Sequence, residues 1–352
     1  MQRVDTDIHR SAVVADTHND LLMLVVRRSA AQCGKYFRER WLPQLRAGGV
    51  DIQVLPIFID EQFRPEGALR QTLRMIESAH RLAEANPDAV GLCRTGVEVD
   101  EVLSSGRIAL VLALEGCPQI DDDVELLRLL GRLGIRVVSF THFGRSALAD
   151  GSSEDATGGR LTSAGVEALS VLEEDGLILD VSHLGQAGVD HVLEIATRPV
   201  LATHSSARAL RDHHRNLTDD QIKGIAATEG VVCVNFYAGF VADHDATVGS
   251  VVDHIEHVAW VAGIEHVGLG PDFIKELVGE LHPGDEPLIS EDVGLDERLA
   301  IPGLEGPAGL PLVTHEMLVR GMSEQDVRAV LGGNVLRLFR ADLGRPGVRG
   351  RG

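Results

Sequence analysis

Short runs of apolar, β-branched residues alternate along the chain with longer segments of helical periodicity. The runs are apolar at consecutive positions, as in parallel strands buried on both faces, and the segments between them suit crossover helices. The pattern predicts strands at Ala12–Ala15, Val50–Phe58, Ile108–Leu114, Ile135–Phe140, Leu177–Val181, Pro199–Ala202, Val231–Val234 and His266–Leu269. It predicts helices at Gly67–Glu84, Asp123–Leu133, Thr162–Glu174, Ala187–Ala196, Thr218–Thr228 and Val251–Ala262.

Eight strands separated by helices favour a closed (β/α)8 barrel, a TIM-like α/β fold, over an open parallel sheet. We expect one barrel domain over residues 1–341 and a disordered, basic and Gly-rich tail over 342–352. The polar stretch Asp150–Gly159 is expected to be a long loop. Residues Lys275–Pro311 combine acids and prolines with little periodicity, and we interpret them as a second excursion that forms a lid. Ser323–Phe339 is expected to be a terminal helix capped by Ser323.

Six of the predicted strands end in, or are followed by, residues of three types, Asp, Glu and His. They are Asp16, His18, Asp20, Glu115, His142, Asp180, His183, His204 and Asp272. Because parallel barrel strands end on one rim, these side chains should converge there. A single histidine or aspartate of this kind is explained as a structural residue or a helix cap. Polar groups from six strand ends brought together would be uncompensated unless they bind a cation. Without a Cys pair, imidazoles and carboxylates suit zinc or a similar divalent ion. The set exceeds the needs of one catalytic zinc, so it predicts two metals that share a carboxylate.

Charge and cysteine usage narrow the function classes. The chain has 53 acidic and 33 basic residues, a formal charge of −20, which repels nucleic-acid backbones and excludes nucleic acid as an expected partner. Its longest apolar runs, such as Ile108–Leu114, are too short to span a membrane. The first ten residues mix Arg and Asp, unlike a secretory signal, and the 4 scattered cysteines predict reduced thiols. We therefore expect a cytoplasmic protein.

Two histidine clusters allow more than one interpretation. His254 and His257 are spaced i, i+3 on a predicted helix, where a solvated helix face is favoured over a metal site. The run His213–Asn216 follows the sixth strand and is either a basic surface cluster or an anion clamp beside the metals. Arg215 would suit the second role, because a guanidinium binds a carboxylate through two parallel hydrogen bonds.

An ordered set of short motifs runs along nearly the whole chain, from about Val14 to Phe339. The motifs are Asp-Thr-His-Asn-Asp-Leu at 16–21, Leu-Glu-Gly at 114–116, Thr-His at 141–142, Asp-Val-Ser-His at 180–183, Thr-His-Ser-Ser-Ala at 203–207, Arg-Asn at 215–216, Val-Asn-Phe-Tyr at 234–237, Gly-Pro-Asp-Phe at 270–273 and Gly-Asn-Val-Leu-Arg at 333–337. Together they resemble the renal (membrane) dipeptidase family of zinc peptidases, in a soluble bacterial form.

The resemblance implies a (β/α)8 barrel that holds two Zn²⁺ per protomer and cleaves dipeptides. It places His18 and Asp20 on one zinc, and His183 and His204 on the other. Glu115 would bridge the two ions. The resemblance also implies a homodimer.

The same resemblance assigns roles around the substrate. His142 would lie near the scissile carbonyl and bind substrate, Arg215 would hold the substrate carboxylate, and Asp272 would transfer the proton. The chain departs from the family pattern at Cys117, where a glycine is usual, and at Ile274–Lys275, where Asp-Gly is usual. We expect both departures to lie beside the pocket and to affect the choice of substrate.

Three functions follow from this interpretation. The first is a zinc-dependent dipeptidase, a metallopeptidase that hydrolyses dipeptides with a free C-terminal carboxylate. The second is a pathway-specific zinc amidase for a peptide conjugate, a lactam or a natural-product intermediate, and the unusual segment 275–311 favours it. The third is a catalytically silent barrel that only binds, which is disfavoured because every expected metal ligand is present.

Overall fold

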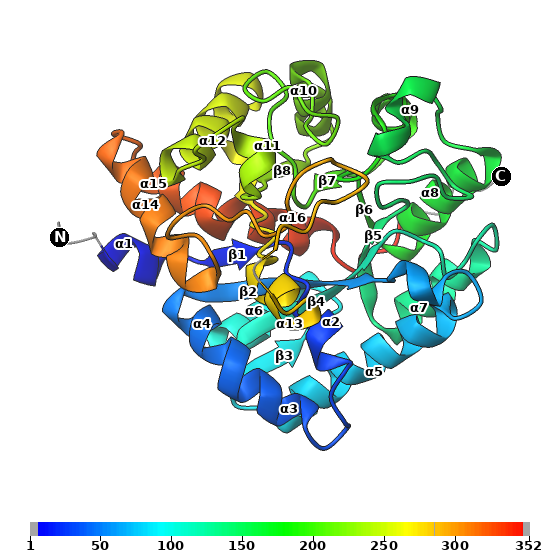
Figure 1. Cartoon of the computed structure of the whole chain (residues 1–352), viewed down its shortest axis with the longest axis horizontal. Helices are drawn as coiled ribbons and strands as arrows, with labels where there is room; N and C mark the ends of the chain where they lie inside the picture. The colour runs from blue at the N-terminus through cyan, green and yellow to red at the C-terminus, as the bar shows by residue number, and fades with distance from the viewer. Residues whose placement is uncertain (1–5, 285, 348–352) are drawn as a thin grey trace.

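The computed structural model describes residues 6–284 and 286–347. Eight parallel strands form the wall of a barrel in the order β1-β2-β4-β5-β6-β7-β8-β9, and helices surround them (Figure 1). The strands are β1 (Val14–Asp16), β2 (Val50–Phe58), β3 (Val90–Leu92), β4 (Ile108–Glu115), β5 (Ile135–Ser139), β6 (Ile178–Asp180), β7 (Leu201–Ala202), β8 (Val231–Val234) and β9 (Val267–Leu269). The predicted (β/α)8 fold is confirmed.

The barrel is nearly closed. Each strand of the ordered path pairs in parallel with the next from β1 to β9. A hydrogen bond also joins the first and last strands. The backbone N–H of Thr17, the residue after β1, donates to the carbonyl of Leu269 in β9 at 3.2 Å. The hydroxyl of Thr17 donates to the same carbonyl at 3.0 Å. This closure brings the ends of the first and last strands together.

Helices alternate with the strands and begin at recognisable caps. The hydroxyls of Thr162, Thr218 and Ser323 each accept from a backbone N–H in the first turn of a helix, so the predicted Ser323 cap is confirmed. The helices are α1 (Thr6–Ser11), α2 (Leu21–Val25), α3 (Cys33–Tyr36), α4 (Leu42–Ala47), α5 (Ala68–Ala85), α6 (Gly96–Ser104), α7 (Glu125–Leu133), α8 (Ser163–Asp175), α9 (Gln186–Ile195), α10 (Asp219–Ala227), α11 (Ala238–Val241), α12 (Val248–Ala262), α13 (Lys275–Leu281), α14 (Leu310–Val319), α15 (Glu324–Arg328) and α16 (Asn334–Asp342).

The terminal helix is interrupted, where one continuous helix was predicted. A wide turn at Ala329–Gly333 separates α15 from α16. Gly332 lies against β1 there, and a Cβ on it would approach the carbonyl oxygen of Val13 to 2.6 Å. The close approach requires glycine and breaks the helix. Strand β3 was also missed, because it has only three residues; it pairs with β4 outside the barrel order.

Strand β4 explains how a carboxylate reaches the barrel interior. Its residues are all buried, and its two faces pack into different clusters. Leu110, Leu112 and Leu114 pack in the larger cluster with the surrounding helices, whereas Ala109, Val111 and Ala113 pack in the smaller one, which gathers side chains of other barrel strands. Because side chains alternate along a strand, Glu115 follows the second set and points into the barrel.

Three predicted irregular segments have more structure than expected. A 3-10 turn, Ser152–Thr157, occupies the loop after β5. The excursion Lys275–Pro311 begins with helix α13, and the chain after α13 passes over the middle of the ring of helices (Figure 1). In the tail, the N–H groups of Gly344 and Gly347 donate to the carbonyls of Gly176 and Glu173, and residues 348–352 lie outside the described part. Within residues 6–284 and 286–347, no helix is long and apolar enough to cross a membrane.

Candidate metal centre

The five predicted metal ligands come together at the C-terminal end of the barrel. His18 and Asp20 follow β1, Glu115 ends β4, His183 follows β6 and His204 follows β7. All five are buried, with at most 7% of any residue exposed. Positions far apart in sequence therefore form one polar cluster, as the convergence of parallel strand ends predicts.

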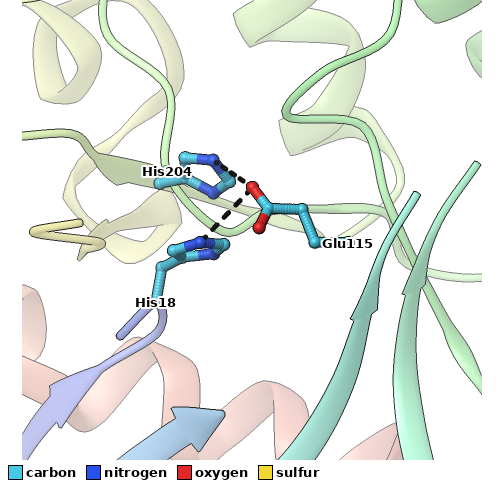
Figure 2. A group of neighbouring side chains, drawn as sticks. All are labelled: His18, Glu115 and His204. Atoms are coloured by element: carbon cyan, nitrogen blue, oxygen red, sulfur yellow. Dashed lines mark ion pairs between the residues drawn. The ribbon is translucent and has the colours of Figure 1, made fainter. Parts of the chain in front are cut away.

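Glu115 lies at the centre of this cluster. Its Oε1 is 2.9 Å from Nε2 of His183, 3.5 Å from Nε2 of His18 and 3.6 Å from Nε2 of His204. Figure 2 shows the imidazoles of His18 and His204 one above the other, both next to the same carboxylate oxygen. The same oxygen is 4.0 Å from Nε2 of His142, and Oδ2 of Asp20 is 3.6 Å from Nε2 of His18. One carboxylate is thus within reach of four imidazoles.

The cluster fits divalent metal ions. Nε2 of His18 and Oδ1 of Asp20 are buried and have no hydrogen-bond partner within the described residues, a costly state unless a further ligand binds them. Nε2 of His183 and Nε2 of His204 face each other at 2.9 Å. Imidazole nitrogens and carboxylate oxygens are the donors that zinc and similar ions take in proteins. The cluster therefore has the donor atoms of a metal centre, and two of them are buried without a hydrogen-bond partner among the described residues.

The protonation of these groups also suits metal binding. Burial lowers the pKa of His183 and of His204 well below the usual value, with the cation of Arg215 adding to the effect, so both imidazoles are neutral. Burial alone would lower the pKa of His18, but Glu115 and Asp20 outweigh it and raise that pKa well above 6.5. Burial raises the pKa of Glu115 to about 7. A cation would replace the proton that this buried set otherwise attracts.

The carboxylate of Asp180 orients His204, one of the predicted ligands, through the hydroxyl of Thr203. Nδ1 of His204 lies 2.8 Å from the hydroxyl of Thr203, whose hydroxyl lies 2.5 Å from Oδ2 of Asp180. The hydroxyl has one proton, which it donates to Asp180, so it accepts the Nδ1 proton of His204. Nε2 of His204 is then free to bind metal, the usual arrangement around a ligating histidine. Asp180, one of the strand-end carboxylates, is a positioning residue.

Asp272 lies beside His18 and Asp20 at the edge of the cluster. It follows β9 and has φ 56°, a left-handed conformation that is unfavourable for a non-glycine residue and is often found at functional sites. Its carboxylate lies within reach of His18 and Asp20, and its Oδ2 accepts from the side-chain amide of Asn235 at 3.1 Å. Burial raises the pKa of Asp272. Asn235, in the Val-Asn-Phe-Tyr motif, had been given no role.

Arg215 is a buried cation at the edge of the cluster. Its guanidinium donates to the carbonyl of Ser182, to the carbonyl of His204 at 3.0 Å and to the hydroxyl of Ser205 at 3.4 Å. Within residues 6–284 and 286–347 it has no ion-pair partner, and burial lowers its pKa to about 10. Only 3% of Arg215 is exposed, so it is not part of a surface basic cluster. A buried guanidinium without a counterion favours an anionic ligand.

A cavity of about 260 Å³ opens above the cluster, and about half of the residues that line it are apolar or aromatic. Asp20, Glu115, His142, His183, Arg215 and Asp272 reach it, so six of the eight predicted site residues line it. Aromatic residues that the sequence analysis did not single out form much of the wall, namely Phe58, Phe143, Tyr237 and Phe240. Phe58 and Phe143 lie at or just after strand ends, which could have marked them. His142 has 23% of its side chain exposed and borders this space.

The two departures from the family pattern have different surroundings. Ile274 lines the cavity, as predicted, together with residues of α13 and of the loop after it, whereas Lys275 does not line it and pairs with Glu305 at 3.8 Å. Cys117 does not line it: the thiol is buried and donates to the carbonyl of Ser139 at 3.3 Å. The segment after β9 therefore covers the centre, which agrees with a lid, whereas Cys117 is a packing residue.

The two histidines of α12 are not on a solvated face. His254 is completely buried, its Nδ1 accepts from the N–H of Ala207 at 3.0 Å, and its Nε2 lies 3.1 Å from the carbonyl of Val241. His257 is 2.8 Å from a carboxylate oxygen of Asp219. The prediction of a solvated face was wrong, because i, i+3 spacing on α12 places both residues toward its neighbours. Both histidines therefore form hydrogen bonds with other parts of the protein rather than a metal site.

Known proteins resemble the chain in sequence and in structure. A profile of the family described as membrane dipeptidase (peptidase family M19) matches residues 2–285. The dipeptidase verJ of Clonostachys rogersoniana is 33% identical over 282 residues, covering 80% of this chain and 66% of that protein. The chain thus spans just under two thirds of that relative.

Solved structures agree. The dipeptidase AC, a metallopeptidase of family M19, is 25% identical with a TM-score of 0.80, covering 95% of this chain and 100% of the other. A metallopeptidase from Rhodobacter sphaeroides, solved with a phosphinate mimic of the dipeptide L-Ala-D-Ala, is 25% identical with a TM-score of 0.79, covering 93% and 98%. The family profile covers most of the chain, so the chain belongs to the membrane dipeptidase family, peptidase family M19, and is a hydrolase of the metallopeptidase type.

Proposed function

We propose that the protein hydrolyses the amide bond of dipeptides that have a free C-terminal carboxylate, with two Zn²⁺ ions per protomer. The observation that carries the proposal is the position of Glu115, whose single oxygen Oε1 lies within 4.0 Å of four imidazole nitrogens. His18 and Asp20 would hold one ion, His183 and His204 the other, and Glu115 both. Ions bound there supply Lewis-acid chemistry, since they lower the pKa of water and polarise a carbonyl.

The chain's own residues complete the reaction. Asp272, held by Asn235 at 3.1 Å, would take a proton from the attacking water and pass it to the leaving amine. The burial of His142 lowers its pKa well below 6.5, so its ring is neutral and keeps one N–H to donate to the carbonyl oxygen as negative charge develops there. The apolar part of the cavity wall, which includes Phe58, Phe143 and Phe240, would reduce the contact of these groups with water and strengthen both interactions.

Arg215 would set the requirement for a free carboxylate. Its guanidinium is fixed by the carbonyls of Ser182 and His204, it lines the cavity, and it has no counterion within the described residues. A substrate carboxylate would neutralise it by charge-assisted hydrogen bonds. Because the cation lies beside His183, with 3.4 Å between Nη2 and Nε2, the peptide bond of a short substrate would lie over the metal cluster.

Metal content gives the direct test of this proposal. Protein purified without chelator should contain two zinc ions per chain, since the cluster has more ligands than one ion takes. Chelation should remove hydrolysis of a dipeptide panel, and added Zn²⁺ should restore it. Elemental analysis and peptide turnover measure these two results. A ratio near one ion per chain with full activity would contradict the bridging role of Glu115.

Arg215→Ala should chiefly weaken the use of dipeptides with a free C-terminus. A charge-assisted hydrogen bond contributes about 1.5–3 kcal/mol, so kcat/KM should fall about ten- to a hundredfold. Replacing the substrate carboxylate by an amide should cost the wild type about as much, and the two losses should not add, because both remove one contact.

The comparison of acid and amide substrates separates binding from mere structural damage. Arg208→Ala is the matched control, since Arg208 lies in the same loop and pairs with Asp212 at 2.8 Å. If Arg215→Ala kept the wild-type preference for a free carboxylate, the clamp would be wrong. The pathway-specific amidase would then be the better proposal, and the segment after β9 that lines the cavity favours it.

Location and assembly stay predictions. All four cysteines are free and buried, which agrees with a reducing compartment and supports a cytoplasmic location. A homodimer is expected from the family resemblance.

A further inference from the structure

Two cavities meet beside the metal cluster. The cavity of about 260 Å³ above the cluster shares three wall residues, Met23, Phe58 and Asp60, with a second cavity of about 240 Å³. We call the second one the side chamber; it lies among α2, the end of β2 and α5. Because the same side chains border both spaces, the two cavities adjoin at these three residues, and a substrate group bound at the cluster would reach the side chamber past them.

The side chamber lies across the barrel from Arg215. In the strand order, β2 is the second strand and β7 the sixth, so they are opposite each other in a barrel of eight. Phe58 is the last residue of β2, and Arg215 follows β7. A dipeptide with its C-terminal carboxylate on Arg215 and its amide bond over Glu115 would therefore direct its N-terminal residue toward the side chamber. This step rests on the proposed function.

The far wall of the side chamber is polar and basic. Gln71 and Arg74 line it from one face of α5, since residues three apart in a helix are neighbours. Gln71 is 8% exposed, and its side-chain amide makes no hydrogen bond within the described residues. Arg74 and Arg27 are exposed and have no ion-pair partner among residues 6–284 and 286–347, although the chain has a net charge of −20.

The acidic group at the junction, Asp60, is hydrogen-bonded within its own loop. Both carboxylate oxygens of Asp60 accept hydrogen bonds from Gln62, one from its backbone N–H and one from its side chain, each at 3.1 Å. Met23 and Phe58 give the junction an apolar surface. The chamber thus has an apolar entrance and a basic far end with an unpartnered amide.

We propose that the side chamber binds the side chain of the substrate's N-terminal residue and selects long side chains that have an apolar stem and end in a carboxylate. The stem would contact Met23 and Phe58, and the carboxylate would accept hydrogen bonds from Gln71 and Arg74. Arg27 would add positive charge at the rim. The substrate class is therefore an acidic-tailed dipeptide rather than a small neutral one.

Two matched dipeptides test this. 2-Aminosuberyl-glycine and 2-aminooctanoyl-glycine differ only in ending the side chain with a carboxylate or a methyl group, and alanyl-glycine measures hydrolysis without the side chain. The wild type should favour the carboxylate over the methyl substrate by about fivefold in kcat/KM, the upper range for a solvent-accessible ion pair. High salt should reduce this preference, because it screens exposed charges.

Variants locate the preference. Arg74→Glu should abolish or reverse it, and Gln71→Leu should reduce it. Arg70→Glu is the control, since Arg70 is an exposed arginine of the same helix that does not line the chamber. Equal rates for the two long substrates in the wild type, or equal effects of Arg74→Glu and Arg70→Glu, would overturn the subsite. Failure to hydrolyse any of the three dipeptides would instead overturn the proposed function.

Discussion

Glu115→Gln should lose most of the enzyme's hydrolytic activity and weaken the binding of both metal ions. The amide keeps the shape of the carboxylate but removes the negative charge that lies within 4.0 Å of four imidazoles. Even residues that only support metal ligands typically contribute about 10- to 100-fold to affinity or activity. A bridging ligand touches both ions, so we expect a loss above that range, seen in peptide turnover and in zinc content per chain.

Thermal stability provides a second readout for this variant. A ligand that binds only the folded protein raises its stability, so zinc should raise the Tm of the wild type and raise that of Glu115→Gln much less. Glu125→Gln is the matched control, because its carboxylate is exposed on α7 and pairs with Arg128. A Glu115→Gln protein that binds two ions as tightly as the wild type would show that Glu115 is not shared between them.

The placement of the metal ligands could be predicted because strand direction determines it. Glu115 directly follows an apolar strand, and the alternation of Ala109, Val111 and Ala113 carries it to the barrel interior. His183 and His204 follow the buried strands β6 and β7. A parallel barrel leaves such residues only one common destination, so the convergence required no knowledge of individual contacts.

The supporting contacts could not be predicted, because they depend on tertiary packing. Nothing in the local sequence indicates that Thr203 forms hydrogen bonds with both Asp180 and His204, or that Asn235 donates a hydrogen bond to Asp272. Arg215 could be assigned only as a surface group or a clamp, since its burial depends on carbonyls from two strand ends. The helix periodicity of α12 likewise did not indicate which face was buried.

The sequence predicted only in outline that a segment covers the metal centre. Acids and prolines in 275–311 indicated an excursion, but helix α13 within it was missed. Ile274 and three α13 residues, Leu277, Val278 and Leu281, turn apolar side chains toward the cavity. The departure of Ile274 from the family pattern thus changes the cavity wall, where it can affect the choice of substrate.

Asp272→Asn should lower kcat for every dipeptide alike and leave both metal ions bound. The asparagine oxygen can still accept from Asn235, whose amide is 3.1 Å from Oδ2 in the native site, so the local structure should persist. The amide cannot take the proton from water or return it to the leaving amine. General acid–base groups contribute about 10²- to 10⁴-fold, and kcat should fall within that range while KM changes little.

The uniformity of the loss distinguishes proton transfer from substrate binding. Arg215→Ala should discriminate between acid and amide substrates, whereas Asp272→Asn should reduce both by the same factor, because every substrate needs the proton. Asp292→Asn, in the loop over the opening, is the control and should have near wild-type kcat. If Asp272→Asn instead lost zinc in elemental analysis, the carboxylate would be a ligand beside His18 and Asp20, a position that its distance to them permits.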